Sequence, residues 1–226
     1  MKRILTLATG LLLVLACVGT VAAVPEVNVV TNGGFEDPQI TGIASFGMDT
    51  GLPGWTFESG GIDLINTYWQ PYSGSHSIDL AGNSPAKISQ TLNVVPDATY
   101  TLTFWLAGNP DTPGKKVLKV YWDGTEVTPT TRSLTVETKG KSHTDMGWTL
   151  VTISGLKAKG PTAKITFEQE ATDYYKCGVA LDEISIVGPP VDPPTPAPEF
   201  PSMAFPAAML VGFMGIILFV QKSRKD

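Results

Sequence analysis

Between residues 24 and 188 the apolar positions recur mostly with a period of two and almost nowhere with the period of a helix. In the segment 100–106, alternate residues are apolar and would share one face of a strand, while the residues between them would share the other: Tyr100, Leu102, Phe104 and Leu106 against Thr101, Thr103 and Trp105. Similar short segments, rich in Val, Ile, Thr and aromatic residues, predict strands at Val27–Thr31, Gly61–Ile65, Ser77–Leu80, Ile88–Val95, Val117–Trp122, Trp148–Ser154, Thr162–Glu168 and Val179–Val187.

Gly, Pro, Asn and Asp separate these segments, and Asp123-Gly124 is typical of a hairpin turn. Nine or ten short strands without helical periodicity predict an all-β fold. We expect one domain, a jelly-roll β-sandwich over residues 24–188.

The last predicted strand changes its alternation part-way. Val179 and Leu181 are apolar at odd positions, whereas Ile184 and Ile186 are apolar at even positions. One extra residue at Asp182-Glu183 would return both sets to the core, so the pattern predicts a β-bulge that redirects a carboxylate.

Both ends of the chain have the composition of targeting segments. Residues 1–23 combine a basic start, an apolar stretch and small residues before a cleavage point after Ala23, as in a signal peptide; a lipoprotein cleavage before Cys17 is the alternative. Residues 203–220 form an uncharged apolar run, followed by a basic tail at 221–226. This run predicts a transmembrane helix with a cytoplasmic tail and an exported domain, with a buried core helix as the alternative.

A Pro-rich spacer and a short junction, residues 189–202, connect the domain to the apolar run. Pro198-Glu199-Phe200, followed by an apolar helix and a short basic tail, resembles the archaeal PEF-CTERM sorting signal. That resemblance implies processing by an archaeosortase after signal peptidase, with transfer of the cell-surface protein to a membrane lipid.

The charge excludes some partners. Outside the two targeting ends the chain has 11 Lys and Arg against 20 Asp and Glu, which opposes binding to nucleic acid or anionic lipid. Only Cys177 remains in the expected domain, so it has no internal disulfide.

Several short motifs are scattered over residues 27–187. They are Asn32-Gly33-Gly34-Phe35-Glu36, Gly54-Trp55, Gly61–Ile65, Tyr68-Trp69-Gln70, Gly74–Leu80, Tyr100–Phe104, Ala107–Asp111, Gly147-Trp148 and Leu181-Asp182. In this order they resemble the DUF642, or choice-of-anchor C, family. The resemblance implies a galactose-binding-like jelly roll, an extracellular role associated with polysaccharide, and no known catalytic activity. Trp105 departs from the smaller or polar residue expected at its position.

Related carbohydrate-binding jelly rolls hold a structural calcium ion between an opening Asn-Gly-x-Phe-Glu stretch and an Asp of the final strand. By that resemblance, Glu36 and Asp182 are the expected ligands of one Ca²⁺, which would join the two ends of the domain. In the alternative, Glu36 accepts hydrogen bonds from a turn and Asp182 is a solvated bulge residue.

Aromatic residues that face outward are candidates for sugar binding, because sugars stack their C–H faces on rings. Trp105 shares its face with threonines, and Tyr121 faces opposite to Trp122. Trp69, Gln70 and Tyr72 lie in an expected loop. Packing in the core is the alternative for each aromatic residue taken singly, and we expect it for Trp55 and Trp148.

No catalytic motif is present. Acidic pairs such as Glu36-Asp37 occur, but no Gly-x-Ser-x-Gly sequence does, and we expect His76 and His143 to lie in loops. The sequence therefore predicts a non-catalytic surface protein that binds polysaccharide. A structural or adhesive surface protein and a polysaccharide hydrolase are the alternatives.

Overall fold

The computed structural model describes residues 25–171 and 176–191. This part of the chain is all-β and contains the strands β1 (Val27–Asn28), β2 (Ile43–Gly47), β3 (Thr56–Ile65), β4 (Ser77–Asn93), β5 (Thr99–Gly108), β6 (Lys115–Trp122), β7 (Thr125–Glu126), β8 (Thr135–Glu137), β9 (Thr149–Lys157), β10 (Thr162–Gln169) and β11 (Val179–Gly188). In these two ranges no helix has the length and apolar character needed to cross a membrane. The expected signal peptide, sorting motif and apolar run lie outside the described residues.

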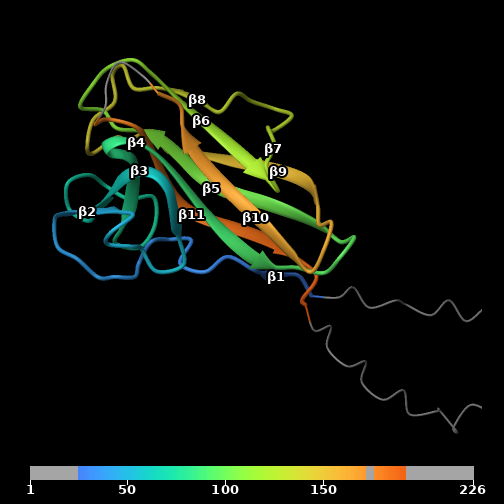
Figure 1. Cartoon of the computed structure of the whole chain (residues 1–226). Helices are drawn as coiled ribbons and strands as arrows, with labels where there is room; N and C mark the ends of the chain where they lie inside the picture. The colour runs from blue at the N-terminus through green and yellow to red at the C-terminus, as the bar shows by residue number, and fades with distance from the viewer. Residues whose placement is uncertain (1–24, 172–175, 192–226) are drawn as a thin grey trace, which may run out of the picture.

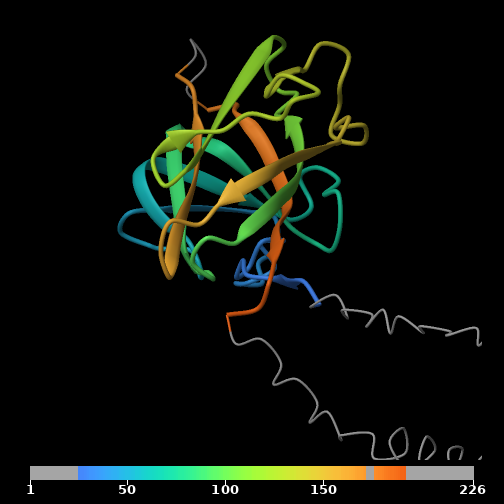
Figure 2. The ribbon, with the colours of Figure 1, turned by 90° about the vertical axis from the view of Figure 1, so that its right-hand side faces the viewer.

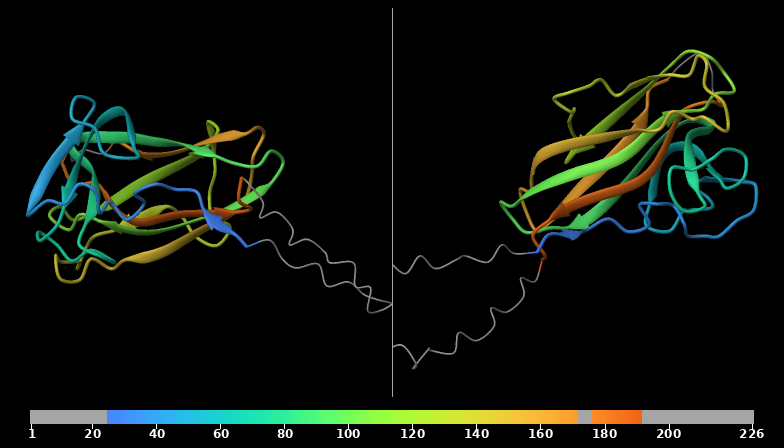
Figure 3. Two further views of the ribbon diagram at one scale, coloured as in Figure 1. Left: turned by 90° about the horizontal axis from the view of Figure 1, so that it is seen from below. Right: turned by 180° about the vertical axis from the view of Figure 1, so that it is seen from behind.

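The strands form a jelly-roll sandwich of two antiparallel layers, as expected (Figures 1 and 3). One layer contains β9, β5 and β11, and the other contains β7, β6 and β10. Strand β4 joins them, because its first part pairs with β11 at Ile78 and Asp79 while its last part pairs with β10 from Lys87 to Asn93.

The core between the layers has the composition that the alternating pattern predicted. The four apolar residues of β5 are fully buried, whereas Trp105 and its threonine neighbours are only partly buried. Phe104 of β5 meets Phe167 of β10 edge-to-face at a centroid distance of 5.4 Å. Trp55 is buried against Phe167 at 6.0 Å, as expected.

Two strands that the sequence predicted separately form a single long strand, β4. Segments 77–80 and 88–95 were predicted separately because Gly82, Asn83 and Pro85 between them are turn residues, yet β4 runs through all three. The pairing of β4 with β3 continues along its length but shifts its register several times. One shift needs Gly60, which has a φ of +66°, because a Cβ there would lie 2.3 Å from the Pro85 carbonyl oxygen. The short strands β2, β7 and β8 were not predicted.

The bulge predicted in the last strand is confirmed. The pairing of β11 with β5 shifts between Asp182 and Ser185, and Glu183 has a positive φ of 50°. The Ile184 N–H donates to the Gly33 carbonyl at 2.9 Å. A Cβ at Gly33 would lie 1.9 Å from the Ile184 carbonyl oxygen, so the bulge requires glycine in the Asn32-Gly33-Gly34 motif.

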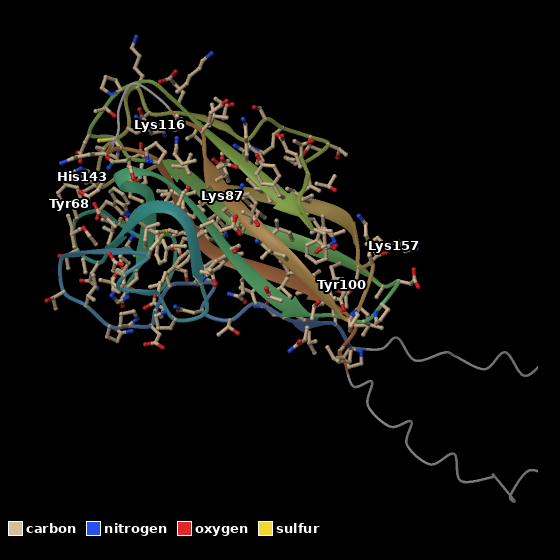
Figure 4. The ribbon with its side chains drawn as sticks, viewed as in Figure 1. Tyr68, Lys87, Tyr100, Lys116, His143 and Lys157 are labelled. Atoms are coloured by element: carbon tan, nitrogen blue, oxygen red, sulfur yellow. The ribbon has the colours of Figure 1, made fainter. Side chains whose placement is uncertain are left out.

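The first and last strands meet at one end of the sandwich, where Val27 pairs with Gly188 (Figure 2). Strand β11 runs from there toward the opposite end and covers about 30 Å at roughly 3.3 Å per residue. Tyr68 and His143 lie at that opposite end (Figure 4). The loops described next therefore lie at the end of the sandwich opposite to the points where the chain enters β1 and leaves β11.

Candidate functional site

The segment 66–76 connects β3 to β4 and lies over the outer face of β5 and β11; we call it the clamped loop. Its anchor is Trp69, which is 3% exposed and packs in a second, small hydrophobic cluster outside the sandwich. The space for the indole comes from two small residues, Ala107 and Ala180, which are register partners on β5 and β11. The indole N–H donates to Ser77 Oγ at 2.8 Å. Since its ring is enclosed, Trp69 offers no face to a sugar and serves as the anchor of the loop.

Asp182 holds one part of the clamped loop. Its Oδ2 accepts hydrogen bonds from the backbone N–H groups of Tyr72 and Ser73 at 2.9 and 3.1 Å, and its Oδ1 accepts from Glu183 at 2.7 Å. The side chain is fully buried. Burial raises the pKa of Asp182 to about 7 despite these three donors.

Glu36 holds the next part of the loop. Its Oε1 accepts from the backbone N–H groups of Ser75 and His76 at 2.8 and 3.0 Å, and its Oε2 lies 3.0 Å from His76 Nδ1. His76 lies in the loop, as expected, and its side chain is fully buried. Burial alone would raise the pKa of Glu36, but the hydrogen bonds from His76 and from the two amides together hold it below 4.5.

These contacts bear on the expected calcium ion. Glu36 and Asp182 do connect opposite ends of the chain, but they do so through the clamped loop. Amide N–H groups point at three of their four carboxylate oxygens and the His76 ring faces the fourth. Across residues 25–171 and 176–191 no group of three or more His, Cys, Asp and Glu side chains is placed to hold a metal ion. In this arrangement the two carboxylates do not fit a Ca²⁺ site, which needs six to eight oxygen ligands.

Two of the candidate sugar-binding residues meet directly. The Tyr72 ring stacks on the Trp105 indole with a centroid distance of 3.5 Å and an interplanar angle of 14°. Tyr72 is 44% exposed, and Trp105 is partly buried beside it. Leu150, the register partner of Trp105 on β9, is 47% exposed. Tyr72, Trp105 and Leu150 form a continuous apolar strip, the aromatic platform.

The rest of the clamped loop is held by its backbone. The Gln70 N–H donates to the His143 carbonyl at 2.9 Å, and the Trp148 indole N–H donates to the Gln70 carbonyl at 3.0 Å. The Gln70 side chain stays exposed. Trp148 was expected in the core, but it is only partly buried and packs against the small outer cluster. The pattern of β9 could not show this, because the cluster exists only where the clamped loop covers the sheet.

A polar group beside the loop was not predicted. Tyr68 is held by Asp111 and His143: its hydroxyl donates to Asp111 Oδ2 at 2.8 Å, and its ring lies 4.3 Å from the His143 ring. His143 Nε2 lies 2.7 Å from Asp111 Oδ1. The motifs Tyr68-Trp69-Gln70 and Ala107–Asp111 were part of the family resemblance, but nothing in the sequence indicated that Tyr68, Asp111 and His143 meet.

A pocket of about 320 Å³ lies next to Tyr68, and its lining includes Asp79 and Asn109. Asp79 is buried and accepts hydrogen bonds from the Asn109 amide at 2.7 Å and from the Gly178 N–H at 2.9 Å. Burial raises the pKa of Asp79 to about 6. The chain thus keeps a second buried carboxylate at the end of the sandwich that carries the clamped loop.

Tyr121 lies apart from the other candidates. It is on β6, in the opposite layer. Tyr121 and Trp122 face opposite sides, as the alternation predicted, and the structure shows that Tyr121 is the outward one. Lys87 Nζ lies 5.0 Å from the Tyr121 ring centroid. The structure therefore brings Trp105 and Tyr72 together, holds Gln70 in the same loop against His143 and Trp148, and leaves Tyr121 on the other face.

Comparison with known proteins agrees with the motif pattern. The profile of the family described as "Protein of unknown function (DUF642)" matches residues 28–187. The chain belongs to the DUF642 family. It is also similar to halomucin of Haloquadratum walsbyi, with 30% identity over 194 residues, or 80% of this chain. That stretch is 2% of the length of halomucin.

Several solved structures are similar to this chain at low identity. A family 61 carbohydrate-binding module in complex with β-1,4-galactotriose has a TM-score of 0.45 and 21% identity, over 70% of this chain and 97% of the module. The CBM22-1 xylan-binding domain of Paenibacillus barcinonensis Xyn10C has a TM-score of 0.44 and 21% identity, over 64% of this DUF642 chain and 92% of that domain. A family 35 module from Clostridium thermocellum has a TM-score of 0.41 and 16% identity, over 72% and 97% of the two chains.

Proposed function

We propose that this DUF642 protein is a non-catalytic module that binds polysaccharide on the aromatic platform. The observation that carries the proposal is the face-to-face stack of Tyr72 on Trp105 at 3.5 Å. The stack leaves the outer side of an exposed aromatic ring available on the surface of a domain whose other large aromatic residues are mostly buried.

The chemistry of the platform suits a sugar. A pyranose presents a flat C–H face that packs on an aromatic ring, and its hydroxyl groups need hydrogen-bond partners around that ring. The exposed Gln70 amide and the hydroxyl groups of Thr103 and Thr152, which pair next to Trp105 and Leu150, are available for this purpose. These three groups are uncharged, and we therefore expect a neutral sugar chain, although the guanidinium of Arg132 also lies at the platform and donates to the Leu150 carbonyl at 3.3 Å.

The clamped loop is built to present Tyr72 without a large entropic cost. Asp182 and Glu36 fix the backbone at four of the five positions from Tyr72 to His76, all except Gly74, and Trp69 anchors the loop against the sheet. A loop that is already ordered does not lose its conformational freedom on binding, which favours affinity.

Affinity electrophoresis tests the proposal. The full-length chain is run through gels that contain neutral galactan, xylan, mannan or β-glucan. At least one of these should retard the wild-type chain, and Tyr72→Ala should weaken that retardation by about tenfold or more, because the lost ring contact is of the order of 1.5–3 kcal/mol. Tyr72→Ala leaves the backbone hydrogen bond to Asp182 in place, so the loop should keep its position.

Met48→Ala is the matched control, because Met48 is a large apolar side chain that is 70% exposed and lies outside the platform. Equal retardation of the wild type and Tyr72→Ala would remove the platform from the proposal. If none of the polysaccharides retards the wild-type chain, the proposed function itself is wrong for neutral glycans.

We also propose that the domain is exported and held at the cell surface, with signal peptidase acting near Ala23 and the 203–220 segment or an archaeosortase-attached lipid as the anchor. The meeting of β1 with the end of β11 supports this arrangement, because both flanking segments leave the domain at the end away from the clamped loop. Mass spectrometry of the protein from its native membrane tests it. A mass that lacks the first 23 residues and ends near Pro198-Glu199-Phe200 with an added lipid is expected, and an untrimmed soluble chain would contradict it.

A further inference from the structure

A groove lies on the outer face of the layer that does not carry the platform. It crosses β3, β4, β10 and β6, has a volume of about 440 Å³, and is lined by Glu58, Lys87, Tyr121, Asp123, Gly124, Lys164 and Thr166. This volume is within the range of small-molecule sites. Neither the aromatic platform nor the clamped loop contributes to it.

A row of register partners crosses the sheet at the groove. Thr56 of β3 pairs with Ser89 of β4, Ser89 pairs with Thr166 of β10, and Thr166 pairs with Tyr121 of β6. Side chains of register partners stand on the same face, and of this row Thr166 and Tyr121 line the groove. The small Thr166 side chain beside the large Tyr121 ring leaves part of the hollow.

The walls of the groove are charged groups held by ion pairs. Glu58 is directed there by a register shift in β3, and it pairs with Lys164 at 2.5 Å and with Lys87 at 3.9 Å. Lys87 also pairs with Glu168 at 3.3 Å and lies over the Tyr121 ring. These side chains are between a quarter and a half exposed, so each keeps donors or acceptors open to solvent.

The balance of charge indicates which ligand the groove suits. Two lysines face Glu58, Asp123 and Glu168, so no strong field of one sign would select an anion or a cation. A sugar hydroxyl donates and accepts at once, and it can bridge an ammonium group and a carboxylate that are already fixed next to each other. The Tyr121 ring adds a flat apolar surface for the C–H face of a sugar beside these hydrogen-bonding pairs.

The groove and the platform face in opposite directions. The inner faces of β5 and β10 meet in the core through Phe104 and Phe167, so Trp105 and Tyr121 point out of the two opposite faces of the sandwich. Figure 4 shows Lys87 over the sheet, well away from Tyr68 and His143 at the end of the domain.

We propose that the Tyr121 groove is a second binding site for neutral polysaccharide, so that one domain bridges two glycan chains. This inference rests on the proposed function of the platform and extends it from binding to cross-linking. A bivalent domain gathers chains into a network, which a domain with one site cannot do.

Two measurements on the full-length chain test the inference. Titration calorimetry with a hexasaccharide of the neutral polysaccharide that retards the wild type should give two sugars bound per chain. Tyr121→Ala should reduce this to one, and Tyr121→Leu should do the same while keeping an apolar residue of similar size in β6. Mixing the polysaccharide with wild type should produce turbidity at about equal site ratios, and both variants should lose at least ninety per cent of it. These expectations follow from loss of one of two independent sites.

Lys119→Ala is the matched control, since Lys119 is on the same strand and face as Tyr121 but pairs with Glu170 outside the groove. It should keep two sites and full turbidity. One sugar per wild-type chain, lost in Tyr72→Ala and unchanged in both Tyr121 variants, would overturn the second site and leave the proposed function standing. No binding of any neutral glycan by the wild type would overturn both.

Discussion

Asp182 and Trp105 are register partners on β11 and β5, and both contact Tyr72. The carboxylate of Asp182 accepts the Tyr72 backbone N–H at 2.9 Å, while the Trp105 indole stacks on the Tyr72 ring at 3.5 Å. One pair of neighbouring residues thus fixes both the main chain and the side chain of the residue that we place at the centre of the sugar-binding surface.

Asp182→Asn is expected to destabilise the fold and weaken sugar binding together. An Asn side chain has one acceptor oxygen, so at least one of the three amides that Asp182 now binds would be left without its partner in a buried position. An unsatisfied buried group costs about 1–3 kcal/mol. Urea unfolding measures the loss of stability, and affinity electrophoresis measures the loss of binding. Glu183→Gln, at the exposed neighbour in the same bulge, is the control and should change neither.

Trp69→Ala is expected to lower the unfolding free energy much more than Tyr72→Ala does, because Trp69 anchors the loop whereas Tyr72 is placed to contact the sugar. Trp69 is enclosed in the outer cluster, so its truncation should cost about 3–5 kcal/mol of unfolding free energy. Tyr72 is 44% exposed, and its truncation should cost about 1 kcal/mol or less while it removes the ring of the platform. Urea midpoints of the two variants check this. Equal destabilisation by both would show that Tyr72 is a packing residue.

The free energy of unfolding is expected to fall as the pH rises from about 4 to about 7. Asp182 and Asp79 have folded-state pKa values raised to about 7 and about 6 from the ordinary 3.8, so in this range the folded state keeps protons that the unfolded chain has released. Their contribution is complete below pH 3.8 and is lost as the pH passes the two raised values. Glu36, with its lowered pKa, acts in the opposite direction and only as the pH falls below 4.5.

Urea unfolding at about pH 5, 6.5 and 8 measures this dependence. The decrease in unfolding free energy should be smaller in Asp182→Asn, because that variant lacks one of the two carboxyl groups whose pKa is raised in the folded state. Stability that rises steadily from pH 5 to pH 8 would contradict the assignment.

Gly33→Ala is expected to be strongly destabilising. The new Cβ would lie 1.9 Å from the Ile184 carbonyl oxygen, so either the opening turn or the bulge of β11 must move, and with it the carboxylate of Asp182. The expected cost is about 2 kcal/mol or more. Gly160→Ala is the control, because nothing lies within 4 Å of a Cβ there. Thermal unfolding of the two variants gives the comparison.

Removal of calcium is expected to leave the melting temperature unchanged. The oxygens of Glu36 and Asp182 that a Ca²⁺ ion would need already accept backbone hydrogen bonds from the clamped loop or face His76. Calorimetry with EDTA and then with added CaCl₂ checks this. A rise of several degrees on adding calcium would restore the metal site that the family resemblance implied.

The alternation of residues along the chain predicted which side of a strand is buried and where its alternation changes, although it divided β4 into two strands. The alternation of β5 predicted which side of it is buried, and the change of alternation at Asp182-Glu183 predicted the bulge. Both follow from the period of two that every strand imposes on its side chains. Outward placement of Trp105 and the opposite facing of Tyr121 and Trp122 followed for the same reason, although the pattern could not say that Trp105 and Tyr121 lie on opposite faces.

What the tertiary structure decided depends on contacts between distant segments. The loop amides that Glu36 and Asp182 accept from are 39 to 110 residues away along the chain. Neither local sequence indicates that the carboxylate binds a backbone amide and not a metal ion. Trp69 was expected to face a ligand because it lies in a loop, yet two alanines on β5 and β11 provide space that encloses it. Loops have no period, so their side chains are directed by the surface on which the loop lies, and that surface exists only after the two layers have assembled.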